Sequence, residues 1–130
     1  MTKKVVKFSS QALSQLLHDM NEEGGFSIAV ITDREGFSIA SAAQAGQDPD
    51  TQSAVVALVQ KTAQQVSHQL GLSKTDEISL YDEQGQRLVC RPFSINGHDM
   101  ILAVTVPHRG QSYRRVTNKG ITAIQRHWKL

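Results

Sequence analysis

Five histidines, one cysteine and a pair of carboxylates are the side chains of this sequence that could bind a metal or perform catalysis. The histidines lie in separate parts of the chain, and no two are three or four residues apart, the spacing that brings two ligands onto one helix face; they are His18, His68, His98, His108 and His127. A metal site would therefore need distant segments to converge. Surface or helix-end positions explain these histidines more simply, so we predict no metal and no cofactor.

The remaining candidates for catalysis are equally poor. Asp33 and Glu35 could act as paired carboxylates in acid–base chemistry, but they flank a short glycine-containing loop, where acids are common for conformational reasons. Cys90 has no base beside it and fits a small buried hydrophobe. No segment matches a nucleophile elbow, a phosphate loop or a dinucleotide fingerprint. We predict that the protein is not an enzyme.

Four cations near the end of the chain fall on one face of a helical wheel; they are Arg115, Lys119, Arg126 and Lys129. All 12 acidic residues lie in residues 1–99, so the last segment is basic. This basic face could attract phosphate, an acidic protein or an anionic membrane, or it could simply be solvated. Nucleic-acid binding is disfavoured, because no aromatic residues interleave the stripe and the isoelectric point is only about 8.9.

The composition predicts a single domain spanning residues 1–130. Of the 130 residues, 39% are hydrophobic and 20% are charged, which suffices for a core without disulfide or zinc support. The longest apolar run, Ala54 to Val59, is far shorter than the roughly 20 residues of a membrane span. The first ten residues lack the apolar stretch of a signal peptide. We therefore predict a soluble, cytoplasmic protein.

Hydrophobic periodicity and turn residues predict the order α-β-β-α-β-β-β-α. The first helix is expected to be capped by Ser9 and to stop at Gly24-Gly25, the second to run from Pro49 to Leu70 with Asp48 as N-cap and Gly71 as left-handed cap, and the third to run from Tyr113 to Trp128 with Ser112 as cap. Two strands are expected between the first and second helices, Phe26 to Asp33 and Phe37 to Ala42. Three more are expected between the second and third helices, Ile78 to Tyr81, Arg87 to Phe93 and Met100 to Val106. A hydrophobic staple between Phe8 and Leu13 is expected at the first helix.

The strand patterns predict how the sheet is arranged. The first and last strands are apolar on both faces, which is typical of central strands covered by helices on either side. Ile78 to Tyr81 alternates with serine and is expected at an edge. If hairpins join neighbours, the strand order is 2-1-5-4-3. The sequence thus predicts an α+β fold with a five-stranded antiparallel sheet, the second helix on one face and the first and third on the other.

The second helix has one broad apolar side, which we expect the sheet to cover; its members are Val55, Leu58, Val59, Thr62, Ala63, Val66 and Leu70. On the other side, Ala54 and Ala57 make the first half apolar all the way round. Alanines on a surface are ordinary helix formers. Small side chains would also let a second helix approach closely in a symmetric dimer, and the uncharged edge strand at Ile78 favours that alternative.

The element order and the hairpin sequence Asp33-Arg34-Glu35-Gly36-Phe37-Ser38-Ile39-Ala40-Ser41 resemble the roadblock/dynein light chain family, in particular its prokaryotic MglB-like members, whose fold is profilin-like. The resemblance spans nearly the whole chain, including the alanine-rich helix and the strand Arg87-Leu88-Val89-Cys90-Arg91-Pro92. It implies a homodimer with a continuous sheet and a role as regulator, such as a GTPase-activating protein, or scaffold of a Ras-like small GTPase. The family does not bind or hydrolyse nucleotide unaided, which agrees with the missing phosphate loop.

The resemblance also implies two groups of site residues. The implied dimer positions are Ala54, Val55, Leu58, Val59 and Thr62 of the second helix, and Ile78, Ser79 and Leu80 of the third strand. The implied platform for a GTPase is the paired helix surface, including Ala57, Gln60, Lys61 and Gln64. The basic face matches no motif of the family.

Two functions of different classes follow. In the first, the chain is a non-catalytic homodimer that regulates or scaffolds a Ras-like small GTPase. In the second, it is a sensor or adaptor that binds an anionic membrane or ligand through the basic face of its last helix. Loss of dimerisation in a helix variant would support the first, and salt-sensitive binding to anionic vesicles would support the second.

Overall fold

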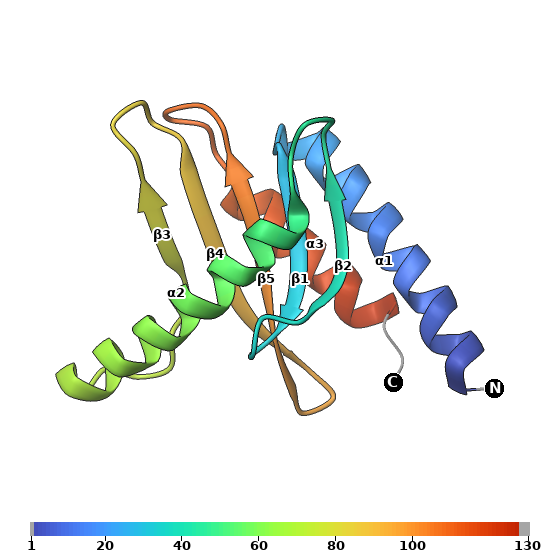
Figure 1. Ribbon diagram of the computed structural model, residues 1–130, viewed down its shortest axis with the longest axis horizontal. Helices are drawn as coiled ribbons and strands as arrows, with labels where there is room; N and C mark the ends of the chain where they lie inside the picture. Colours follow the sequence, from blue (N-terminus) through green and yellow to red (C-terminus); the bar gives the residue numbers. More distant parts are fainter. Residues whose placement is uncertain (1, 128–130) are drawn as a thin grey trace.

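The computed structural model describes the backbone of residues 2–127 and the side chains of residues 11–127. Its elements follow the order predicted from the sequence (Figure 1); they are α1 (Thr2–Gly24), β1 (Ile28–Asp33), β2 (Ser38–Ala43), α2 (Pro49–Leu70), β3 (Ile78–Tyr81), β4 (Arg87–Ile95), β5 (His98–Val106) and α3 (Arg114–His127).

The five strands form one antiparallel sheet in the order β2-β1-β5-β4-β3, as predicted. The centre is β5, where Ala103 pairs with Val30 of β1 on one side and with Cys90 of β4 on the other. Within the described residues, β2 and β3 lie at the two edges. The strand β3 spans four residues and pairs with the first half of β4 alone, from Ile78 opposite Cys90 to Tyr81 opposite Arg87.

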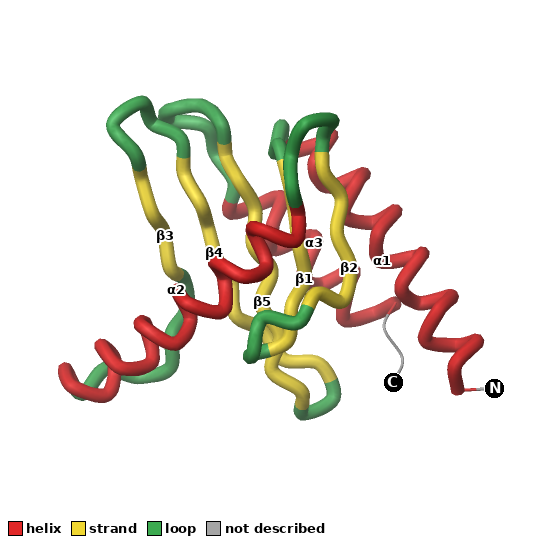
Figure 2. Tube along the Cα trace, in the orientation of Figure 1, coloured by secondary structure: helices red, strands yellow, loops and turns green. Residues whose placement is uncertain are grey.

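Helices cover both faces of the sheet, as predicted: α2 crosses one face, and α1 and α3 lie on the other (Figures 1 and 2). Side-chain alternation along the strands fills both layers. On the α2 side, Val30, Ile101 and Ala103 pack with Val56. On the other side, the larger core includes Ile31 and the buried residues of α1 and α3; the helical members are Leu13, Leu17, Met20 and Ile124.

Two predicted helix starts are wrong. The helix α1 begins at Thr2 rather than at Ser9, because the segment before Ser9 contains no glycine or proline to stop it and an interior serine costs little. The expected staple involves the side chain of Phe8, which lies outside the described side chains. The helix α3 begins at Arg114, and Tyr113 rather than Ser112 accepts the first intrahelical hydrogen bond, from the N–H of Thr117. Trp128 also lies outside the described residues.

The ends of α2 are those predicted. The Asp48 carboxylate accepts hydrogen bonds from the hydroxyl of Thr51 at 2.6 Å and from the N–H of Asp50 at 3.0 Å. These bonds, led by that of Thr51, lower the pKa of Asp48. Gly71 adopts the left-handed conformation with φ +67°, and the N–H of Leu72 closes the helix end on the carbonyl of Ser67.

The predicted contact face of α2 is wrong. Ser53 and Val56 are its buried residues, whereas four of the large residues expected against the sheet are exposed; these are Val55, Leu58, Val66 and Leu70. Two contacts set this rotation of the helix. The Gln52 side chain bonds both the carbonyl of Ala103 and the hydroxyl of Thr105 in β5. At the β1–β2 turn, Gly36 lies so close that a Cβ there would be 2.3 Å from the Cβ of Ala57.

Candidate interaction surface

One outward side of α2 is apolar although no described residue covers it. We define this apolar face by its five members, which recur at helical spacing: Val55, Leu58, Thr62, Val66 and Leu70. Leu58 is 67% exposed and Leu70 is 68% exposed. Apolar side chains grouped in this way on a surface are typical of a protein contact site.

The apolar face continues onto the edge strand β3. Ile78 packs into the core on the α2 side of the sheet, so Leu80, two residues further along the strand, points to the same side. Leu80 is 56% exposed. Within the described residues no strand pairs with the outer side of β3, and the strand carries no charge that would discourage such pairing.

The structure distributes the predicted dimer positions over this surface. Val55, Leu58 and Thr62 lie on the apolar face, and Ser79 and Leu80 lie on the open edge. Val59 and Ile78 are half-buried beneath them. Two exposed residues of the apolar face, Val66 and Leu70, were missed as surface residues. Val66 follows Thr62 by four residues, and Leu70 follows Val66 by four, so the spacing places both on the same helix face as Thr62. The same spacing also fits a helix face that packs on the sheet.

On its other outward side, α2 borders a shallow hollow next to the β1–β2 turn. Its lining includes Ala54 and Leu58 together with three of the four predicted platform residues, Ala57, Lys61 and Gln64, and the turn residues Arg34 and Glu35. Ala54, which the resemblance assigned to the dimer interface, and Leu58 of the apolar face both line this hollow, so the hollow adjoins the apolar face along α2.

The β1–β2 turn presents a large aromatic side chain to solvent. Phe37, which the sequence reasoning did not select, is 69% exposed. The Asp33 carboxylate accepts hydrogen bonds from the N–H groups of Glu35 and Phe37 at 2.9 and 3.0 Å. Asp33 therefore shapes the turn, which is the conformational role expected of an acid at this position.

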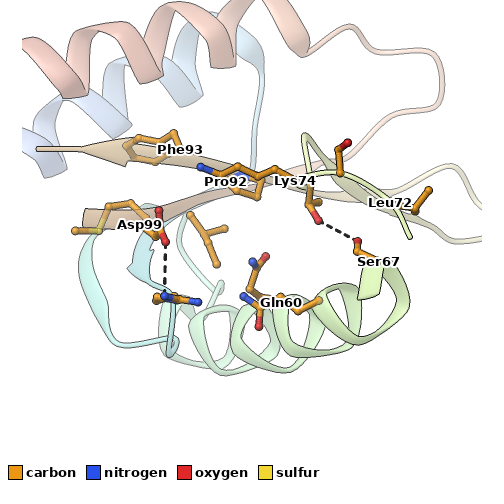
Figure 3. A pocket seen from close by; sticks show the side chains of 13 residues that line it. Gln60, Ser67, Leu72, Lys74, Pro92, Phe93 and Asp99 are labelled. Carbon is orange, nitrogen blue, oxygen red and sulfur yellow. Dashed lines mark hydrogen bonds and ion pairs between the residues drawn. The ribbon is translucent and has the colours of Figure 1, made fainter. Parts of the chain in front are cut away.

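Gln60, the fourth predicted platform residue, faces inward. It lies on the side of α2 that faces the strands and lines a pocket between the helix and the sheet (Figure 3). We call this cavity the inner pocket. Among the predicted platform residues, Gln64 lines both the inner pocket and the hollow.

A charged cluster connects β3 to α3. The guanidinium of Arg91, in a residue only 6% exposed, donates to Thr117 and Asn118 at 2.8 and 2.7 Å and lies 3.9 Å from Glu77. Arg114 donates to Glu77 at 2.6 Å, and Tyr113 donates to the same carboxylate. Burial alone would raise the pKa of Glu77, but these hydrogen bonds and the neighbouring cations hold it below its usual value.

The predicted basic face is only partly available. Arg115, Lys119 and Arg126 are exposed on α3, and Lys129 lies outside the described residues. The ammonium of Lys119 is 2.8 Å from the carboxylate of Glu23 on α1. The helix α1 thus supplies a negative charge beside the basic face.

The candidate catalytic and metal-binding side chains of the sequence are buried or dispersed in the described part of the chain. Cys90 is buried, and burial raises the pKa of its thiol to about 12. No three histidine, cysteine or acidic side chains in residues 11–127 are grouped so that they could hold a metal ion. Within the same part of the chain, every helix is too short or too polar to cross a membrane.

The sequence matches no family model and no curated protein. Solved structures of other proteins share its fold, among them the following three. The gliding protein MglB of Thermus thermophilus superposes with a TM-score of 0.74 at 18% identity, over 92% of this chain and 90% of that one. MglB of Myxococcus xanthus superposes with a TM-score of 0.66 at 11% identity, over 88% of this chain and 83% of that one.

The third is a roadblock/LC7 domain from Streptomyces avermitilis, with a TM-score of 0.65 at 14% identity, over 87% of this chain and 92% of that one. The strand order and the placement of the helices agree with the fold that the sequence resemblance implied. The chain therefore has the roadblock fold, in the form found in MglB proteins.

Proposed function

We propose that this chain is a prokaryotic MglB-like member of the roadblock family that acts in the cytoplasm as a non-catalytic, homodimeric regulator or scaffold of a Ras-like small GTPase. The observation that carries the proposal is the apolar face of α2, which continues through Leu80 onto the open edge of β3. A second copy of the chain is the partner that fits both features, because an edge strand and a helix face can each pair with their own copies about one twofold axis.

Dimerisation would remove the exposed apolar area from water and complete the hydrogen bonds of β3. Fully burying a leucine contributes about 1.5–3 kcal/mol, so Leu58 and Leu70, each about two thirds exposed, would supply a large part of the association free energy. The uncharged side chains of β3 allow its copy to pair directly.

The dimer is tested by placing a charge on the apolar face. Leu58→Arg should weaken self-association by at least roughly 100-fold, because a guanidinium without a partner would be buried in the contact. His68→Arg is the matched control, since His68 is exposed on the side of α2 away from the apolar face. Dissociation constants from sedimentation velocity measure both. Equal association of the two variants would contradict the proposed interface.

The hollow beside the β1–β2 turn is the part of the surface that we assign to the GTPase. It combines Arg34, Glu35 and Lys61 with the small side chains of Ala54 and Ala57, and Phe37 lies exposed on the same turn. An exposed aromatic residue and an arginine are residue types that protein interfaces favour, and charged side chains are typical of the rim of such a contact.

This assignment is tested by capture from a lysate of the source organism. We expect a small GTPase to be captured and its amount to differ between GTP and GDP. Lys61→Glu should reduce capture about tenfold while the protein stays dimeric, because it reverses a charge inside the hollow and leaves every member of the apolar face unchanged, including Leu58, which lines both surfaces. Capture that is independent of nucleotide, or that is unchanged in Lys61→Glu, would contradict the GTPase role.

Binding of an anionic surface by α3 has less support. The ion pair between Lys119 and Glu23 lowers the net positive charge of the basic face.

A further inference from the structure

The outer side of β3 presents a defined set of backbone groups. The N–H of Asp82 donates to the carbonyl of Gln86, so Asp82 directs its backbone groups toward β4. Backbone groups point to alternate sides along an antiparallel strand. Leu80 therefore also points toward β4, whereas the N–H and carbonyl groups of Ser79 and Tyr81 point away from β4 to the open edge.

This pattern restricts how a second copy of β3 can pair with that edge. Directly opposite residues of an antiparallel pair point either both toward each other or both away. A twofold axis must therefore pass through a residue and not midway between two residues. An axis at Ser79 pairs all of residues 77–81. An axis at a neighbouring residue shortens this ladder, and an axis at Leu80 also brings in Asp82, whose carboxylate already accepts the N–H of Gln86 in the turn.

On the α2 side of the sheet, an axis at Ser79 gives the exposed leucine of β3 an apolar neighbour. Leu80 is 56% exposed, and the axis places it directly opposite the partner's Ile78. Ile78 packs against the α2-side core and is only half-buried. Each leucine would therefore cover the exposed part of an isoleucine and would itself be removed from water.

On the α3 side, the same axis places Tyr81 directly opposite the partner's Glu77. Glu77 and Ser79 share this side, because the Ser79 hydroxyl donates to the Glu77 carboxylate at 2.9 Å, and Tyr81 follows two residues after Ser79. The guanidinium carbon of Arg87 lies 4.2 Å from the centre of the Tyr81 ring. The Tyr81 hydroxyl donates to no described residue of its own chain. Its own Glu77 is out of reach, since four residues span roughly 13 Å along a strand.

The Glu77 carboxylate can accept one further hydrogen bond. It accepts hydrogen bonds from three side chains of its own chain, those of Ser79, Tyr113 and Arg114. An ionised carboxylate offers about four acceptor positions. A phenol hydroxyl opposite Glu77 in the dimer would occupy the remaining position, and a hydrogen bond to an ionised acceptor is stronger than one between neutral groups.

We propose that the twofold axis of the dimer passes through Ser79 and that Tyr81 of each copy donates a hydrogen bond to the partner's Glu77. This inference rests on the dimer proposed above and assigns to Tyr81 and Glu77 the register of that dimer and its specificity for a second copy of this chain. Each copy supplies one donor and one acceptor. Both contacts therefore form only between chains that carry both residues.

The register is tested on the wild-type chain by mixing isotopically labelled and unlabelled copies and recording isotope-filtered NOE spectra. We expect a strong Hα–Hα contact between Ile78 and the partner's Leu80, because a pair without mutual hydrogen bonds brings the two Cα atoms within about 4.5 Å. A dimer in which Leu80 instead contacts the partner's Leu80, or Ile78 the partner's Ile78, would overturn this register and leave the dimer itself intact. A monomeric mass would overturn both.

The contact between Tyr81 and Glu77 is tested by Tyr81→Phe, which keeps the ring beside Arg87 and removes the hydroxyl. The Kd of the dimer should rise about tenfold, since each dimer loses two hydrogen bonds. The increase should be smaller in a Glu77→Gln background, where the acceptor is no longer ionised, and unchanged in a Glu83→Gln background, which is the matched control. Concentration-dependent light scattering gives these constants. Wild-type association of Tyr81→Phe, or an equal increase in both backgrounds, would overturn the contact.

Discussion

At the scale of single residues, the β1–β2 turn determines how α2 is placed on the sheet. Gly36 is held at φ +90° against Ala57, and this contact determines which side of α2 meets the sheet. The acids of the same turn have a conformational role, as Asp33 shows by accepting two backbone hydrogen bonds. The turn thus fixes the rotation of α2 and, through it, the side that faces solvent.

Gly36→Ala should lower the free energy of unfolding by about 3 kcal/mol, of which roughly 1 kcal/mol comes from the left-handed backbone and the rest from overlap with Ala57. Gly46→Ala is a matched control, because Gly46 has φ +87° but a Cβ added there would have nothing within 4 Å. Gly46→Ala should lower the free energy of unfolding only by the roughly 1 kcal/mol of the left-handed backbone. Urea denaturation measures both, and equal losses in the two variants would show that the contact with Ala57 is not tight.

At the scale of elements, β3 is held in place by α3. Glu77 stands immediately before β3 and receives hydrogen bonds from Tyr113 and Arg114 at the start of α3. The buried Arg91 of β4 lies beside the same carboxylate. The strand β3, which we assign to the dimer edge, is therefore positioned by a charged cluster rather than by a long ladder of backbone hydrogen bonds.

This cluster predicts a pH dependence. Because the pKa of Glu77 is lowered in the folded chain, its contribution to stability is fully present above the pKa of the unfolded chain, about 4.3. It is lost as the pH falls through the depressed folded value. Glu77→Gln should be less stable than the wild type at neutral pH and should approach it in acid.

Glu83→Gln is the control, because the side chain of Glu83 makes no hydrogen bond or ion pair with another described residue. Chemical denaturation across the acid range measures the difference. A stability gap between Glu77→Gln and the wild type that stays constant as the pH falls would contradict this role of Glu77.

Most of the elements could be predicted from the sequence because their signals are local. Asp48 and Gly71 mark the ends of α2 through side-chain and backbone preferences that need no tertiary information. The rotation of α2 could not be predicted in this way. A helix with one apolar side toward a core and another toward a partner gives a single broad apolar pattern, and tertiary contacts such as those of Gln52, Gly36 and Val56 decide between the two sides.

The candidate site was predictable in part for the same reason. Leu58 and Leu80 could be placed on a dimer surface through the family resemblance, but Val66 and Leu70 were assigned to the core by the helical wheel. Phe37 gave no sequence signal, because an aromatic residue after a turn is equally typical of a buried strand. The resemblance implied that Gln60 belongs to the outer platform, and the helical spacing of the sequence contains no information on cavities.

At the scale of the whole molecule, charge and hydrophobicity are segregated. All 12 acidic residues precede β5 or lie at its start, and α1 places Glu23 beside the cationic α3. The apolar surface lies on the other face of the sheet, along α2 and at β3. Association through α2 and β3 would therefore leave the charged helices exposed on the far side.

The mass of the wild-type chain in solution tests this account most directly. Sedimentation equilibrium at micromolar concentrations should give about twice the 14.3 kDa of one chain. A mass of 14.3 kDa that persists at high concentration would contradict the account, because it would leave the apolar face and the β3 edge without the partner for which we infer they are built.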